Sequence, residues 1–163
     1  MIGGGTAYGI GYAMRCKQRV KELLELERIL QSISGELKFR HAILSEIFGH
    51  VMERFGQPFR DWLCCLRDDF SSLDADAAGQ IWTSSLQMLK ENSSLSQNDI
   101  LMIESLGASL GCSDLEMQLT ELSFVTELIR CERQNAARDL ANRSKVAVTL
   151  SAVGALMLVI ILL

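Results

Sequence analysis

The amino-acid sequence predicts an all-α fold: a bundle of about five to six helices, a membrane-spanning helix at the C-terminus and a short apolar N-terminal segment. The chain has a single proline and only 6% aromatic residues, whereas residues that favour helices over strands are frequent. Apolar residues recur at helical spacing, and no run alternates with a period of two over a useful length. With 163 residues, 48% of them hydrophobic, the chain has the size of one ordinary domain with its own core.

An uninterrupted apolar stretch occupies residues 146–163. It contains no charged residue and no proline, and its polar side chains are Thr149 and Ser151. A helix of this length rises roughly 27 Å, which is close to the hydrocarbon thickness of a bilayer. The alternative is a buried core helix, but such a helix normally keeps a polar face. We therefore expect a C-terminal transmembrane helix over residues 146–163.

Residues 1–14 form a shorter apolar segment that is rich in glycine. The segment has neither the basic start nor the small-residue cleavage site of a signal peptide. As a helix it would reach only about 21 Å, less than a full span. We expect a partial membrane span, with a re-entrant or surface-lying segment as the alternative. Residues 15–145 then form the helical domain.

Basic residues are concentrated beside the two apolar ends of the chain. They are Arg15, Lys17, Arg19 and Lys21 after the first segment, and Arg130, Arg133, Arg138, Arg143 and Lys145 before the second. By the positive-inside rule, this distribution predicts that the domain between the two ends is cytoplasmic.

The middle of the chain is acidic. From Glu91 to Glu127 the sequence contains no Lys or Arg. This balance argues against nucleic acid as a partner and is compatible with a basic protein partner, although a solvated acidic face is the simpler interpretation. The candidate partner-binding residues are Glu104, Asp114, Glu116, Glu121 and Glu127.

Apolar periodicity and local signals divide the domain into helices. A first helix is expected over 18–37, a second over roughly 43–52, a third from Pro58 to the polar stretch 68–76, and a fourth over roughly 74–91. Ser96 followed by Asp99 predicts the start of a fifth helix, because both residue types stabilise a helix N-terminus. Gly111 is expected to end it. Ser113 and Glu116 predict a capping box for a long final helix that can continue into the apolar tail.

No residue pattern predicts catalysis, a metal or a cofactor. His41 and His50 would lie on opposite sides of a helix. The aspartates between residues 68 and 76 lack the alternation, the glycine and the terminal glutamate of a calcium loop. No serine or cysteine has the setting of an activated nucleophile. We expect a protein that is not an enzyme; an enzyme with an unrecognised cleft is a minor alternative.

One string of residues resembles a known family. The order Leu106-Gly107-x-x-Leu110-Gly111-x-Ser113-Asp114-x-x-x-Gln118, followed by a long polar helix and an apolar end, resembles stage III sporulation protein AB. Ser96-x-x-Asp99 lies at the expected distance upstream of this string, and residues 36–47 resemble the first helix break of that family.

The resemblance implies a non-enzymatic membrane subunit of a complex assembled between mother cell and forespore. Its helical domain would be similar to that of the inner-membrane platform protein of type II secretion machines. The implied partners are a secretion-type ATPase, other membrane subunits and the lipid bilayer, and a homo-oligomer is possible. The implied location is the cell membrane, with the domain on the cytoplasmic, mother-cell side. The alternative function is a membrane-tethered helical signalling adaptor that binds a soluble regulator.

Overall fold

The computed structural model describes residues 3–40, 43–72, 78–110 and 114–162, with side chains from Gly11 to Asn142 inside these ranges and at Val146, Val153, Met157 and Ile160. The helices are α1 (Gly3–Arg40), α2 (Leu44–Met52), α3 (Phe59–Ser72), α4 (Ala78–Asn92), α5 (Gln97–Glu104), α6 (Leu106–Leu110) and α7 (Leu115–Leu162). The described ranges contain no strand, so the prediction of an all-α class is confirmed.

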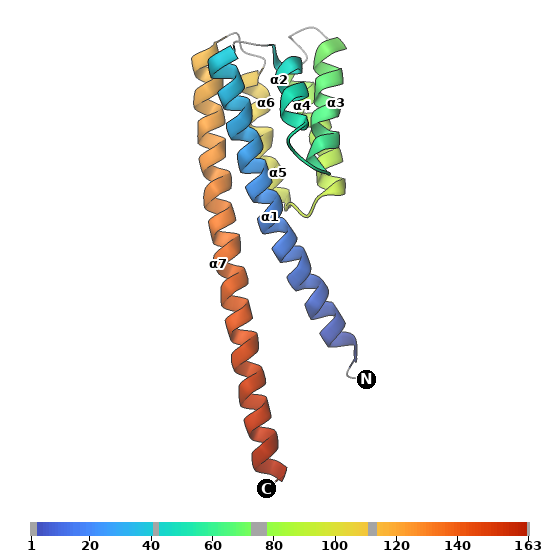
Figure 1. Cartoon of the computed structure of the whole chain (residues 1–163), viewed down its shortest axis with the longest axis vertical. Coiled ribbons are helices and arrows are strands. Elements are labelled where there is room, and N and C mark those ends of the chain that lie inside the picture. Colours follow the sequence, from blue (N-terminus) through green and yellow to red (C-terminus); the bar gives the residue numbers. More distant parts are fainter. Residues whose placement is uncertain (1–2, 41–42, 73–77, 111–113, 163) are drawn as a thin grey trace.

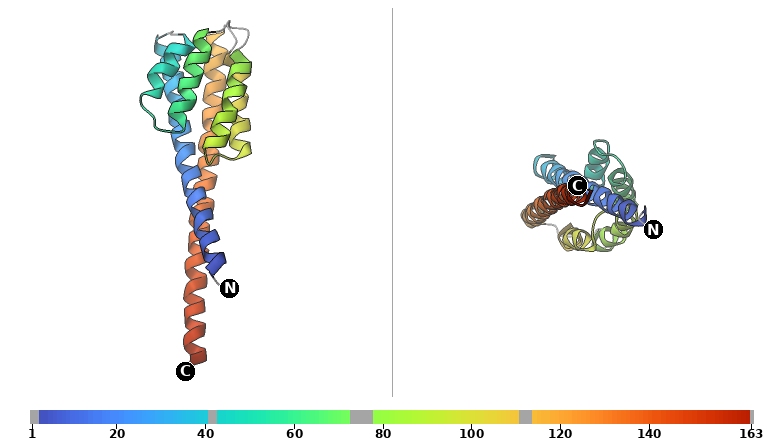
Figure 2. Two further views of the ribbon diagram at one scale, coloured as in Figure 1. Left: turned by 90° about the vertical axis from the view of Figure 1, so that its right-hand side faces the viewer. Right: turned by 90° about the horizontal axis from the view of Figure 1, so that it is seen from below.

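Two long helices organise the molecule. α1 and α7 lie side by side and run in opposite directions, and the five shorter helices gather against the upper halves of this pair (Figure 1). The start of α1 and the end of α7 project together from the lower end, as the side view in Figure 2 also shows. The long pair therefore has one end that carries both termini, whereas the end of α1 and the start of α7 lie at the opposite, upper end.

The buried core takes apolar side chains from all seven described helices, and its two tryptophans lie on α3 and α4. Trp62 and Trp82 meet edge to face, with 5.3 Å between ring centroids. Both indole N–H groups are buried and both donate hydrogen bonds, Trp62 to Ser85 Oγ (2.9 Å) and Trp82 to the carbonyl oxygen of Ile103 (2.7 Å). A buried tryptophan needs such a partner for its single polar group, so these two bonds fix how α3, α4 and α5 pack.

The observed helix boundaries agree only in part with those predicted from the sequence. The predicted helix start at Ser96 is confirmed, and the structure adds a reciprocal capping box there: Ser96 Oγ accepts from the Asp99 N–H at 3.2 Å, and Asp99 Oδ2 accepts from the Ser96 N–H at 2.7 Å. The helix expected to run on to Leu110 is interrupted at Ser105, which separates α5 from α6. α1 does not begin near residue 18 but continues from Gly3. Residues 111–113, with the expected caps Gly111 and Ser113, lie outside the described ranges.

The prediction of a membrane-spanning helix at the C-terminus is wrong for the described part of the chain. None of the helices there meets the combined length and hydropathy expected of a membrane span. The stretch 146–163 does not form an element of its own, because its helical part is the last section of the 48-residue helix α7. Side chains of the stretch are described at Val146, Val153, Met157 and Ile160, and all four are exposed.

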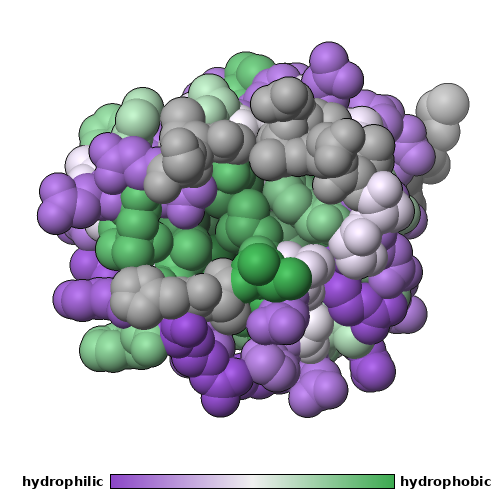
Figure 3. Space-filling view, turned by 90° about the horizontal axis from the view of Figure 1, so that it is seen from above, coloured by the Kyte–Doolittle hydropathy of each residue, from purple (hydrophilic) through white to green (hydrophobic). Residues whose placement is uncertain are grey.

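Apolar side chains also gather at the upper end of the bundle, away from both termini. Figure 3 looks onto this end and shows apolar residues in a hollow with polar residues around it. Phe39, close to the end of α1, and Ile43, just before α2, are 80% and 66% exposed. The upper end of the bundle therefore exposes apolar side chains to solvent.

Candidate functional site

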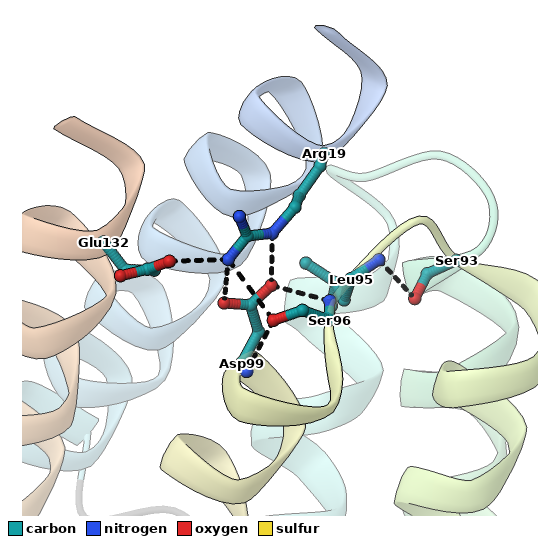
Figure 4. Close-up of polar contacts among 6 residues, drawn as sticks. All are labelled: Arg19, Ser93, Leu95, Ser96, Asp99 and Glu132. Atoms are coloured by element: carbon teal, nitrogen blue, oxygen red, sulfur yellow. Dashed lines mark hydrogen bonds and ion pairs between the residues drawn. The ribbon is translucent and has the colours of Figure 1, made fainter. Parts of the chain in front are cut away.

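A polar junction forms where α1, α5 and α7 meet, from Arg19, Ser96, Asp99 and Glu132 (Figure 4). Arg19 donates from Nε to Asp99 Oδ2 (2.8 Å) and from Nη2 to Asp99 Oδ1 (2.7 Å), which makes a two-pronged contact. The same Nη2 lies 2.6 Å from Glu132 Oε1 and 3.3 Å from Ser96 Oγ. The Asp99 side chain is fully buried, whereas that of Arg19 is 24% exposed. One guanidinium therefore ties a residue of each of the other two helices to α1.

The junction holds two carboxylates against one guanidinium. The hydrogen bond that Arg19 donates to Asp99 raises the pKa of Arg19 above its ordinary value, against the opposing effect of burial, and the hydrogen bond to Glu132 adds to the rise. Two carboxylates thus bind one guanidinium, and charge-assisted hydrogen bonds of this kind are stronger and more geometrically specific than neutral ones. The sequence assigned Arg19 to a membrane-flanking collar. The structure instead gives it partners 80 and 113 residues away, which no local pattern could reveal.

A second charged cluster joins α1 to α7 further up the pair. Glu27 is buried, and its two carboxylate oxygens accept from Arg130 Nε and Arg133 Nε, both at 2.9 Å. Burial by itself raises the pKa of Glu27, but the hydrogen bonds from the two arginines outweigh it, so the net pKa is lowered. Arg130 and Arg133 of α7 therefore bind Glu27 of α1 and hold the two long helices together.

The other basic residues of the expected collars lie differently. Arg15, Lys17 and Lys21 are exposed on α1, and Arg138 is exposed on α7. The side chains of Arg143 and Lys145 lie outside the described set.

The described residues of the family-like string lie on α6 and at the start of α7. Leu106 and Leu110 are buried in the core. Gly107 lies against α4: a Cβ added there would stand 3.1 Å from Trp82 Cδ1 and 3.3 Å from the carbonyl oxygen of Gly79. The two glycines thus let the backbones of α4 and α6 approach closely, which is the use of glycine that a helix contact requires.

The polar members of the string hold the start of α7. Gln118 Nε2 donates to the carbonyl oxygen of Leu110 at 3.3 Å, across the connection between the two helices. Asp114 lies just before α7, and its Oδ1 accepts from the Glu116 N–H at 3.0 Å. A side-chain acceptor at this place satisfies one of the free amide groups of a helix start. These contacts give Asp114 and Gln118 structural roles.

The candidate partner-binding carboxylates lie on one part of the surface, here called the acidic sector: Glu104, Asp114, Glu116, Glu121 and Glu127. Glu104 is on α5, Asp114 precedes α7, and the other three are on the upper half of α7. Asp114, Glu116 and Glu127 are exposed, and Glu104 and Glu121 are partly exposed. Glu127 pairs with Arg130 at 2.9 Å, and Glu121 accepts from Ser105 Oγ at 3.3 Å.

The described residues offer little for cofactor chemistry. No group of three or more His, Cys, Asp or Glu in the described ranges is placed to hold a metal ion. A small crevice between α1 and α7 is lined by Tyr12, Cys16 and Arg19 on one side and by Ala136, Asp139 and Leu140 on the other. Arg19, its strongest polar group, is already bound in the polar junction.

Comparison with known proteins relates this architecture to one family. The model of the family described as stage III sporulation protein AB matches residues 1–163, the whole chain. The chain belongs to the stage III sporulation protein AB family. Stage III sporulation protein AB of Bacillus subtilis (strain 168) is 21% identical over 158 residues, which cover 97% of this chain and 92% of that protein.

A solved structure of a stage III sporulation protein AB has the same fold. It matches with a TM-score of 0.68 at 20% identity, covering 76% of this chain and 97% of the other. At this identity the likeness shows the fold alone. Membership of the stage III sporulation protein AB family supports a role in sporulation, and the family name carries no enzymatic activity.

Proposed function

We propose that this member of the stage III sporulation protein AB family is a non-enzymatic platform subunit of a secretion-like complex of sporulation, and that it docks a secretion-type ATPase. The observation that carries the docking proposal is the acidic sector. Between Glu91 and Glu127 the chain has no Lys or Arg, so α5 and residues 115–127 of α7 carry carboxylates and no basic residue; the nearest base along α7, Arg130, pairs with Glu127. Complementary charge on a partner would favour encounter and fix its orientation.

Charged contacts between α1 and α7 support a platform role. The polar junction and the Glu27 cluster join α1 to α7 at two levels, and in each cluster one carboxylate, Asp99 or Glu27, is buried. Charged contacts of this kind are screened less by salt than surface pairs. A partner bound at the acidic sector would therefore be held at a fixed position relative to the end that carries both termini.

Binding of the full chain to a secretion-type ATPase from the same organism tests the proposal. We expect a complex in pull-down that is weakened when Glu116→Lys and Glu121→Lys are combined, because two attractive charges become repulsive. Glu53→Lys is the matched control, since Glu53 is exposed at the end of α2, away from the acidic sector. Unchanged affinity in the double variant would rule out the acidic sector as the docking surface. Binding only to a soluble regulator would favour a signalling adaptor instead.

The proposed location is the cell membrane, with the helical domain on the cytoplasmic, mother-cell side. Family resemblance supports it, as do the exposed Arg15, Lys17 and Lys21 near the end that carries both termini. Basic residues so placed are attracted to anionic lipid headgroups. Fractionation of sporulating cells should find the full chain with membranes, and recovery entirely in the soluble fraction without detergent would contradict this location.

A further inference from the structure

Three large apolar side chains are exposed inside the acidic sector. Leu101 on α5 and Met117 and Phe124 on α7 are 50%, 54% and 58% exposed. A single exposed apolar residue is ordinary on a protein surface. Met117 and Phe124, however, are seven residues apart, so they lie on the same side of α7 roughly 10 Å from each other. This spacing is that of two anchor positions in a helix contact.

The side of α7 that carries them faces away from the core. The buried apolar residues of this part of α7 are Leu122, Val125 and Ile129, and around the helix they are centred roughly 120° from Met117 and Phe124. Leu101 lies on the neighbouring helix α5, one turn before Ser105, whose hydroxyl donates to Glu121 of α7. Met117 and Phe124 are called the docking strip below, with Leu101 exposed on the neighbouring helix.

Carboxylates border the strip on both sides. On a helix with 3.6 residues per turn, Glu121 and Glu127 are each displaced about 60° from Phe124, in opposite directions. Asp114 and Glu116 are displaced from Met117 by about 60° and 100°, again in opposite directions. The strip is therefore a narrow apolar surface with an acidic border on each side, and the nearest base along α7, Arg130, already contacts Glu27 and Glu127.

We propose that the docking strip binds an amphipathic helix of a protein partner, one whose narrow apolar face is flanked on both edges by Lys or Arg. The inference rests on the proposed function, because it specifies the element through which a docked partner would be held. The apolar side chains would supply the contact area, with the aromatic ring of Phe124 at its centre. The acidic borders would select the partner, since a helix with acidic edges would meet like charges on both sides.

The upper end of the bundle provides an internal comparison. Phe39 is also apolar and exposed, but its neighbours Lys38 and Arg40 are basic. The Lys38 ammonium lies 5.8 Å from the centre of the Phe39 ring. A helix with basic edges should therefore avoid this end and choose the docking strip, although both places expose an aromatic ring.

Two synthetic helical peptides of about 18 residues, a length at which helices begin to be stable in water, test the proposal. They share one leucine face and differ only in having Lys or Glu along both edges. Fluorescence anisotropy with the full chain should show binding of the Lys peptide that weakens with salt, and at least about tenfold weaker binding of the Glu peptide. Phe124→Ala should weaken binding of the Lys peptide by about tenfold, and Phe39→Ala should leave it unchanged.

Equal binding of the two peptides would overturn the proposal, as would a Phe39→Ala loss as large as that of Phe124→Ala. Thermal melting of both variants checks their folding, and both replaced side chains are exposed, so folding should be kept. The outcome is separable from the ATPase experiment. A chain that binds the Lys peptide but not the ATPase would contradict only the proposed function. A chain whose affinity for the ATPase is unaffected by Phe124→Ala would contradict only this inference.

Discussion

Removal of the Asp99 carboxylate is the sharpest test of the polar junction. Asp99 Oδ2 accepts from Arg19 Nε and from the Ser96 N–H, and Oδ1 accepts from Arg19 Nη2, at distances of 2.7–2.8 Å. The substitution Asp99→Ala would leave the Ser96 amide without this acceptor and would leave Glu132 as the carboxylate bound to Arg19. The side chain of Asp99 is fully buried, so water cannot replace it without rearrangement.

The magnitude follows from these contacts. Breaking a buried ion pair by removing one partner costs about 3–5 kcal/mol. Arg19 is 24% exposed and keeps Glu132, so we expect the lower end of that range, about 3 kcal/mol. For a chain of this size each kcal/mol lowers the melting temperature by about 2–4 °C, and we therefore expect a decrease of roughly 10 °C.

Urea and thermal denaturation of the full chain, followed by circular dichroism, measure this loss. Glu132→Ala is the matched control: Glu132 contacts the same guanidinium but is 25% exposed, so its loss should cost only about 1 kcal/mol. A double-mutant cycle with Arg19→Ala and Asp99→Ala should give a coupling energy of about 2 kcal/mol or more. Equal losses for Asp99→Ala and Glu132→Ala, or a coupling near zero, would refute the reasoning.

Three further predictions follow from the core and from the second charged cluster. Trp82→Phe should lower the free energy of unfolding by about 1–3 kcal/mol in urea titration, because the carbonyl of Ile103 loses the buried hydrogen bond from the indole N–H; an unchanged midpoint would contradict this. Gly107→Val should destabilise by about 1–3 kcal/mol through overpacking. Gly35→Ala, where an added Cβ meets no atom within 4 Å, should instead stabilise by up to about 1 kcal/mol, and identical melting of the two variants would disprove the contrast. In the folded chain the pKa of Glu27 is lowered from its ordinary value of 4.5, so the stabilisation from the ionised side chain is present above that pH and is lost as the pH falls through the lower folded-state pKa. Glu27→Gln should reduce this loss of stability at acid pH. Parallel curves of the free energy of unfolding against pH for the two proteins would contradict the prediction.

Local features of the fold could be predicted because they depend on residues close in sequence. The helix start at Ser96 depends only on Ser96, on Asp99 three residues later and on the helix that follows, and it is present as predicted. The helices expected over 18–37 and from Pro58 contain Leu23, Leu30 and Trp62, which are buried. The break at Ser105 was missed, since the apolar period continues across it.

The candidate interaction residues were predicted as a set, but their surroundings were not. Composition alone singled out the acids between Glu91 and Glu127. Only the packing of α5 beside α7 brings Leu101 near the surface that carries Met117 and Phe124. The expected membrane-spanning helix was the main error, because an apolar run was treated as an independent element.

By itself, the sequence determined the all-α class, the helix start at Ser96 and the acidic character of one surface, because each depends on side-chain type and short spacing. Tertiary structure decided which charges become structural. Arg19 was one basic residue among several until the packing of α1 against α5 and α7 placed it beside Asp99 and Glu132. The energy of such contacts depends on burial and on partners far away in the chain, and both exist only after the helices have packed.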